Sequence, residues 1–397
     1  MELSRRVQAI KESPTLAVTA RAAKLKAEGR DIIGLGAGEP DFDTPQHIKD
    51  AAKKAIDNGF TKYTPVAGIP GLKNAIVAKF KRDNGFEYTA KEVIVGVGGK
   101  QCIFNLALAV LNPGDEVIVP APYWVSYADI AIVAEAVPVI VNCGIEQGFK
   151  ITPAQLETAI TPKTKLFMIN SPSNPTGAVY TLAELQALGE ILKKHPHVLV
   201  ATDDMYEHVN LSGTKFVNIL NATPELKDRC VVLNGVSKAY SMTGWRIGYA
   251  AGPENIIKAM EILQSQSTSN PTSISQVAAQ AALEGNQACI EPMLKAFRER
   301  HEFVVRRFNE IPGLKCISAG GAFYAFPDAH EAIAKLYKEG KIPQGNDMAL
   351  SEYLLEKTGV AVVPGSAFGA EGYFRISFAT SMDNLRNALD RIAAALS

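Results

Sequence analysis

The chain has 397 residues, with 41 basic and 41 acidic side chains and 47% apolar residues. This length allows two domains or one large one, and the balanced charge argues against a dedicated nucleic-acid binder, which normally has a basic excess. No run of about 18 apolar residues occurs, so we expect no transmembrane helix and no membrane partner. The first residues lack the apolar core of a secretory signal, and the five cysteines are scattered without a Cys-x-x-Cys pair. Both features favour a cytoplasmic protein with reduced thiols.

The first 42 residues hold one amphipathic stretch and then a short apolar run that ends in glycines at 34–38. Helical patterns at 45–58 and 72–84 flank a loop rich in proline and glycine. From residue 93 onward, short apolar runs alternate with longer helical patterns, which predicts a mainly parallel sheet covered by helices. The predicted strands are 93–95, 116–120, 137–141, 165–169, 198–202, 231–233 and 247–251, and the predicted helices are 101–111, 123–133, 153–160, 182–194 and one from about 254.

The C-terminal third changes character after a long helical pattern at 288–311. Short strand-like segments at 314–317, 323–326, 360–363 and 374–378 are separated by helical patterns at 329–338 and 348–357, and a final helix is predicted at 383–396. We therefore expect a smaller α+β domain that includes the N-terminal segment. The expected boundaries are 46–299 for the large domain and 1–45 with 300–397 for the small one.

Lys238 follows the predicted strand 231–233 and lies among small residues, with Arg246 eight positions later. A single lysine in a loop is usually solvated, but partial desolvation and a neighbouring cation can turn it into a Schiff-base former. Arg246 can bind a phosphate. The Gly98-Gly99-Lys100-Gln101 turn also suits an anion, because it opens a helix after a strand. Gln101 stands where a Walker A loop needs Ser or Thr, so a nucleotide-binding module is disfavoured.

The segment 235–248, Gly-Val-Ser-Lys-Ala-Tyr-Ser-Met-Thr-Gly-Trp-Arg-Ile-Gly, resembles the pyridoxal-phosphate (PLP) attachment site of class I aminotransferases. The resemblance extends over nearly the whole chain and is closest to bacterial aspartate aminotransferases, which carry Ala-Gly-Glu-Pro-Asp-Phe, here 37–42. It implies the α/β fold of type I PLP-dependent transferases. It also implies transfer of the amino group from L-aspartate to 2-oxoglutarate by a ping-pong mechanism.

The same resemblance implies cofactor contacts. Lys238 would hold PLP covalently and then move the proton during catalysis, and Asp203 would keep the pyridine nitrogen protonated. Asn174 and Tyr206 would bind the 3′-oxygen, and Trp124 would lie against the ring. The phosphate would be bound by Gly99, Lys100, Gln101, Arg246 and Ser237, and by Tyr63 from the other subunit. The last contact implies a homodimer with shared active sites.

For the substrate, the resemblance implies that Arg375, Gly38 and Asn174 bind the α-carboxylate and that Trp124 lies beside it. A fork-shaped guanidinium suits that task, although an arginine in a strand is more often an ion-paired surface residue. The run 259–294 contains no Lys or Arg, so the cation for a second carboxylate must come from elsewhere. Lys100 is the candidate. The alternative is that Lys100 contributes only its backbone N–H group to the phosphate site.

Other readings stay open at this stage. Aromatic, prephenate and alanine-type aminotransferases share the scaffold, and a PLP-dependent lyase or decarboxylase would use the same lysine. No metal site is expected, and no DNA-binding module precedes the catalytic region. One departure from many relatives is Gly235, where they have a serine three residues before the lysine. This leaves Ser237 or the backbone to bind the phosphate there.

Overall fold

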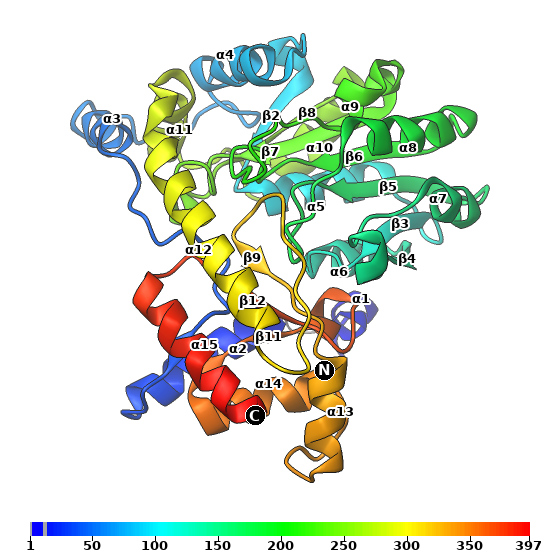
Figure 1. The fold of residues 1–397 in the computed structure, drawn as a ribbon. Coiled ribbons are helices and arrows are strands. Elements are labelled where there is room, and N and C mark those ends of the chain that lie inside the picture. The colour runs from blue at the N-terminus through cyan, green and yellow to red at the C-terminus, as the bar shows by residue number, and fades with distance from the viewer. Residues whose placement is uncertain (1, 11–13) are drawn as a thin grey trace.

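The computed structural model describes residues 2–10 and 14–397, and its main feature is a seven-stranded sheet (Figure 1). The strand order is β2-β8-β7-β6-β5-β3-β4. Only β8 runs antiparallel to its neighbours, so the prediction of a mainly parallel sheet is confirmed. The strands are β2 (Val93–Gly96), β3 (Glu116–Ala121), β4 (Val137–Asn142), β5 (Thr164–Asn170), β6 (Leu199–Asp203), β7 (Cys230–Gly235) and β8 (Gly248–Ala251).

Helices cover both faces of this sheet, because successive strand residues enter two different apolar cores. In β5, Phe167 and Ile169 belong to one core, whereas Leu166 and Met168 belong to the other. The second core is closed by α5 (Gly99–Val110), α6 (Ser126–Val133) and α10 (Glu254–Ser265). The first core is closed by α3 (Gln46–Asp57), α4 (Pro70–Lys79), α7 (Pro153–Ala159), α8 (Leu182–Lys194), α9 (Ile219–Ala222) and α11 (Ser273–Glu284). Burial on both faces explains why the strands are continuous apolar runs.

The long helix α12 (Glu291–Asn309) leads from the seven-stranded sheet to a region with two small sheets (Figure 1). One is antiparallel, with the order β11 (Val363–Pro364), β12 (Phe374–Ser377) and β9 (Tyr324–Ala325). The other pairs β1 (Ile33–Gly34) in parallel with β10 (Val360–Ala361), which ties the N-terminal segment to the C-terminal part. The helices here are α2 (Pro14–Ala27), α13 (His330–Lys338), α14 (Asp347–Thr358) and α15 (Met382–Leu396), while α1 (Arg5–Ala9) contacts α6.

Some local predictions were wrong. No strand forms at 314–317, because the Asn309 side chain pairs with the backbone N–H and C=O groups of Cys316 and leaves only a single bridge from Lys315 to Asp328. The predicted helix 72–84 changes at Phe80–Asn84 into a π-helical turn. Helix α11 was not predicted, since its buried face consists of alanine, serine and glutamine, with Leu283 as its one large apolar residue. Short 3₁₀ turns lie at Ala90–Glu92, Ile145–Gln147, Pro224–Arg229, Thr243–Trp245, Gln287–Ile290 and Gly365–Phe368. Among the described residues, no helix has both the length and the apolar character needed to cross a membrane.

Candidate active site

A cavity of about 400 Å³ lies where the carboxyl ends of several parallel strands meet. Asn170 ends β5, Asp203 ends β6, and Lys238 follows β7, so the central sheet supplies one wall. Tyr324 of β9 and Arg375 of β12 supply part of the opposite wall from the small antiparallel sheet. Ligands of open α/β sheets bind at such strand ends, and the volume is in the usual range for a small-molecule site.

Most of the residues singled out from the sequence meet in this cavity. Two do not line it. The Gln101 side chain turns back, accepting a hydrogen bond from Val97 N and donating one to Thr268 Oγ1. Tyr63 lies in the loop before α4 with 92% of its surface exposed. Those that line the cavity are Gly38, Gly99, Lys100, Trp124, Asn174, Asp203, Tyr206, Ser237, Lys238, Arg246 and Arg375.

The Lys238 amine lies inside the cavity, where Nζ donates a hydrogen bond of 2.5 Å to the backbone oxygen of Gly38. Burial lowers the pKa of Lys238 to about 8; nearby Glu39 opposes this shift, and the positive charges of Arg375 and Arg246 reinforce it. A substantial fraction of this amine is therefore neutral near neutral pH, which is the form that attacks a carbonyl.

Asp203 is buried below the cavity and is held by two donors. Its Oδ2 accepts from Tyr127 Oη at 2.6 Å, and its Oδ1 accepts from Met205 N at 3.2 Å. Burial raises the pKa of the Asp203 carboxyl, while Tyr127, Met205 and Lys238 act against that change. A cationic ligand group facing Asp203 would stabilise its ionised form.

Arg375 is a buried cation without a carboxylate partner among the described residues. Its Nη1 donates to Asn174 Oδ1 at 2.9 Å and its Nη2 to Gly36 O at 2.6 Å, but Nε has no partner. The guanidinium lies between the rings of Tyr324 and Phe368, 4.5 and 4.9 Å from their centres. Burial lowers the pKa of Arg375. The site therefore favours an anion that can pair with this group, unlike an ion-paired surface arginine.

Glycines bring the loop before α5 against Arg246. Gly98 has φ +82°, and a Cβ there would lie 2.3 Å from Arg246 Nη2. A Cβ on Gly248 would lie 2.2 Å from Gly99 N. No described side chain caps α5, and its first residues, Gly99 and Lys100, line the cavity together with Arg246. This arrangement suits a phosphate.

Gly235 is explained by packing. A Cβ at this position would lie 3.1 Å from Gly248 Cα and 3.1 Å from Ile247 O, so the backbone already fills the space of a larger side chain. Ser237 is buried and lines the cavity.

Lys100 and Trp124 form one side of the cavity. The Lys100 ammonium lies 5.0 Å from the centre of the Trp124 ring. Burial lowers the pKa of Lys100, and Arg246 adds to this shift. The cavity thus holds a second cation on a flexible stem, apart from Arg375.

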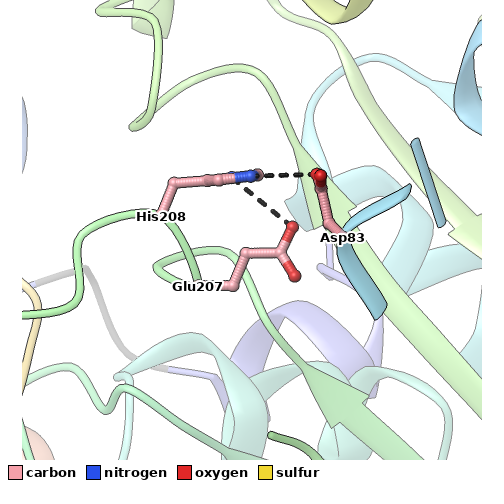
Figure 2. A group of neighbouring side chains, drawn as sticks. All are labelled: Asp83, Glu207 and His208. Atoms are coloured by element: carbon pink, nitrogen blue, oxygen red, sulfur yellow. Dashed lines mark hydrogen bonds and ion pairs between the residues drawn. The ribbon is translucent and has the colours of Figure 1, made fainter. Parts of the chain in front are cut away.

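Asp83, Glu207 and His208 form a charged cluster beside the segment that carries Tyr206, and Figure 2 shows their side chains in contact. His208 Nε2 lies 3.1 Å from Asp83 Oδ2, and Nδ1 lies 3.4 Å from Glu207 Oε1. Fully buried Lys79 pairs with Glu207, and Arg82 pairs with Asp83 at 2.6 Å. These two cations balance the charge of the two carboxylates, and the network joins the turn after β6 to the end of the helical segment at 70–84.

Tyr127 and Tyr324 are among the cavity residues that were missed from the sequence. Tyr127 lies in α6, three positions after Trp124, which precedes the helix. In the predicted helix 123–133 this spacing places both side chains on one face, and that was the available signal. Tyr324 lies inside a predicted strand segment, and nothing in its neighbourhood distinguishes it from a core aromatic residue.

Comparisons with known proteins agree with this geometry. The model of the family "Aminotransferase class I and II" matches residues 30–392. The chain is 64% identical over 397 residues to an aspartate/prephenate aminotransferase of Nitrosomonas europaea, with 100% of both chains covered. A protein of the same description from Cereibacter sphaeroides is 56% identical, with 99% of this chain and 98% of the relative covered.

Solved structures are similar along the whole chain. Aspartate aminotransferase from Rhizobium meliloti matches with a TM-score of 0.95 and 49% identity, covering 100% of this chain and 99% of the other. The enzyme from Thermus thermophilus with maleate matches with a TM-score of 0.93 and 44% identity, covering 100% of both chains. The chain therefore belongs to the class I and II aminotransferases, a family of enzymes that depend on pyridoxal phosphate.

Proposed function

We propose that the enzyme transfers the amino group of L-aspartate to 2-oxoglutarate, giving oxaloacetate and L-glutamate by a ping-pong mechanism. The observation that carries this proposal is that one cavity contains a reactive amine and, besides Arg246, two further cations. Lys238 is the amine, Arg375 is the buried cation without a carboxylate partner, and Lys100 is the second cation. A dicarboxylic amino acid needs this combination.

The residues present fit the cofactor. We assign the phosphate to Arg246, Ser237 and the start of α5, which Gly99, Lys100 and Gln101 form with their backbone. The pyridine nitrogen is assigned to Asp203, whose burial creates the need for a cationic partner. Asn174 and Tyr206 are assigned to the 3′-oxygen, and Trp124 to the ring face. When bound, pyridoxal phosphate supplies an electron sink for the carbanion at the substrate Cα.

The protein's own groups then perform the remaining tasks. Arg375 binds the α-carboxylate, with Asn174 and the backbone near Gly38 beside it, and so orients the Cα–H bond. Lys238 Nζ would take the proton from the substrate Cα and, with the cofactor bound, would return it to the cofactor's C4′. Its pKa of about 8 suits this exchange, because both protonation states are accessible near neutral pH.

Prephenate is a second candidate substrate. The curated relatives that support it carry the description aspartate/prephenate aminotransferase, including the one from Nitrosomonas europaea at 64% identity. A lysine on a flexible stem can pair with the side-chain carboxylate of a small or a ring-shaped substrate, or move aside for an apolar one. We therefore expect a broader range of substrates than two fixed arginines would allow.

The test compares kcat/KM for aspartate and phenylalanine in Lys100→Ala, with 2-oxoglutarate as the acceptor. Loss of one charged hydrogen bond predicts a roughly 10- to 150-fold decrease for aspartate alone. The exposed Lys91→Ala variant, outside the cavity, is the control. An equal decrease for both donors would show that Lys100 serves only the phosphate. Prephenate as the acceptor with an aspartate donor tests the second candidate in the same variants.

Two statements about organisation belong to the same proposal. Residues 46–299 are assigned to a large PLP-binding domain, and residues 1–45 with 300–397 to a small one; the pairing of β1 with β10 supports this division. We also assign a homodimer in which Tyr63 reaches the cofactor phosphate of the partner. Its support is the 92% exposure of a large aromatic side chain in a loop of this subunit. Sedimentation of the holoenzyme tests the dimer.

A further inference from the structure

Tyr324 has no role in the function proposed above, yet it contacts two of the residues that do. It lies in β9 and pairs in register with Ser377 of β12, two positions from Arg375. Side chains two positions apart in a strand point to the same face, which explains why the Tyr324 ring packs on the Arg375 guanidinium at 4.5 Å. Tyr324 also lines the cavity.

The second contact of Tyr324 crosses to the other sheet. Its hydroxyl oxygen lies 2.8 Å from the hydroxyl oxygen of Tyr206, which follows β6 of the seven-stranded sheet. Both side chains are buried, and their rings meet edge to face with centres 5.8 Å apart. This pair of phenols therefore joins the residue beside the α-carboxylate site to the residue beside the 3′-oxygen of the cofactor.

The hydrogen bond between the two phenols can run in either direction, and its direction decides which hydroxyl hydrogen is left for the cavity. Two phenols share one hydrogen bond, so only one hydrogen lies between the oxygens and the other is left for the cavity. If Tyr206 donated to Tyr324, it would have no hydrogen for an acceptor in the cavity. If Tyr324 donates, the Tyr206 hydrogen is free to point at the ligand, and the bond it accepts makes it a stronger donor.

The surroundings favour Tyr324 as the donor. Burial raises the pKa of both phenols. The Arg375 guanidinium counteracts this shift at both phenols, but it lies directly over the ring of Tyr324, 4.5 Å from the ring centre. A cation over the ring withdraws charge from the phenol oxygen and makes the O–H group more acidic. The more acidic phenol is the better hydrogen-bond donor.

We propose that Tyr324 is a positioning residue that donates to Tyr206 and so directs the Tyr206 hydroxyl hydrogen to the 3′-oxygen of pyridoxal phosphate. This rests on the proposed role of Tyr206. Because the bond runs from a residue stacked on Arg375, it links the small antiparallel sheet to the cofactor. A substrate carboxylate that neutralises Arg375 weakens the donor and changes the same hydrogen bond.

The test uses the PLP-loaded protein and the pH midpoint of the visible absorption change of the bound cofactor. A donor to the 3′-oxygen stabilises the deprotonated form, so its loss raises the midpoint. We expect Tyr324→Phe to raise it by about 0.4 to 1 pH unit, the size of one neutral hydrogen bond, and Tyr206→Phe to raise it further. The double variant should match Tyr206→Phe, because Tyr324 acts through Tyr206.

Controls separate the outcomes. Tyr180→Phe removes another buried phenol, whose oxygen accepts from Ile151 N, and should leave the midpoint unchanged. Binding of succinate, an unreactive dicarboxylate, should stay within about twofold in Tyr324→Phe, because the ring that packs on Arg375 remains. The inference is overturned if Tyr324→Phe leaves the midpoint unshifted, or if it shifts the midpoint equally in the presence and absence of the Tyr206 hydroxyl. A tenfold loss of succinate binding in Tyr324→Phe would also overturn it. An unshifted midpoint in Tyr206→Phe would instead overturn the proposed role of Tyr206.

Discussion

Arg375→Lys is the most direct test of how the site binds a substrate. The guanidinium donates one hydrogen bond to Asn174 Oδ1 and one to Gly36 O. Its other N–H groups, including the one on Nε, can donate to a ligand. A lysine keeps the charge but places all its donors on one nitrogen atom at the end of a flexible stem. It cannot keep both protein contacts and still present a fork to a carboxylate.

The expected loss follows from this count of donors. At least one charge-assisted hydrogen bond to the α-carboxylate disappears, which costs about 1.5–3 kcal/mol, or roughly a 10- to 150-fold decrease in kcat/KM. Every amino acid carries an α-carboxylate, so kcat/KM should decrease by a similar factor for all amino-acid donors. The assay is steady-state kcat/KM for aspartate, glutamate, phenylalanine and alanine with one fixed oxoacid.

A matched control is available outside the cavity. Arg300 makes a bidentate ion pair with Asp41, at 2.7 and 2.9 Å, and its side chain is mostly buried. Arg300→Lys therefore loses a fork of the same geometry without touching the ligand site, and should leave kcat/KM nearly unchanged. A defect in Arg375→Lys that is confined to dicarboxylic donors would refute the assignment, because Arg375 would then bind the side chain of the substrate.

Four further changes are expected to have measurable effects. Lys238→Ala should abolish multiple turnovers yet still bind PLP non-covalently, as dialysis and absorbance will show. Asp203→Asn should bind the cofactor but lose most of kcat, because a neutral amide cannot hold the pyridine proton. Gly248→Ala should weaken PLP binding, because its Cβ would lie 2.5 Å or less from backbone atoms of Gly98 and Gly99. Gly244→Ala is the control, because a Cβ there has no atom within 4 Å, and titration of both apoenzymes with PLP compares them. Lys79→Met should reduce the free energy of unfolding by about 3–5 kcal/mol in urea, because Glu207 loses its buried partner.

The central sheet could be predicted from the sequence because its strands are buried on both faces. Residues such as Phe167 and Met168 then form continuous apolar runs, and the longer patterns between the runs are helices. Strand ends carry the chemistry in such a sheet, so Asp203 and Lys238 could be placed at one edge before any contact was known. The antiparallel direction of β8 has no local signal, because it depends on the path of the loop from Lys238 to Gly248.

The two small sheets were harder to predict from the sequence than the central sheet, because their strands have only two to four residues. In such short pieces one side chain can replace a ladder bond, as Asn309 does at Cys316. The orientation of the Gln101 side chain could not be predicted from the sequence either. Its Oε1 accepts a hydrogen bond from Val97 N, and the side chain therefore does not line the cavity. The pairing of Tyr324 with Tyr206 joins positions 118 residues apart, and no periodicity records such a contact.

The net charge of the chain does not predict the charge of the cavity, and the charge of the cavity affects the reactivity of Lys238. The whole chain is neutral, with 41 basic and 41 acidic residues, yet the cavity lining contains four cationic side chains and only Glu39 and Asp203 as acids. If Asp203 serves the pyridine nitrogen, as proposed above, Glu39 is the remaining acidic side chain of the lining that can balance the four cations. Their mutual repulsion lowers the pKa of Lys238 together with burial, and the same excess attracts anionic ligands. In the proposed function, one local excess of positive charge therefore both lowers the pKa of the amine and favours a dicarboxylic substrate. The cations are Lys100, Lys238, Arg246 and Arg375.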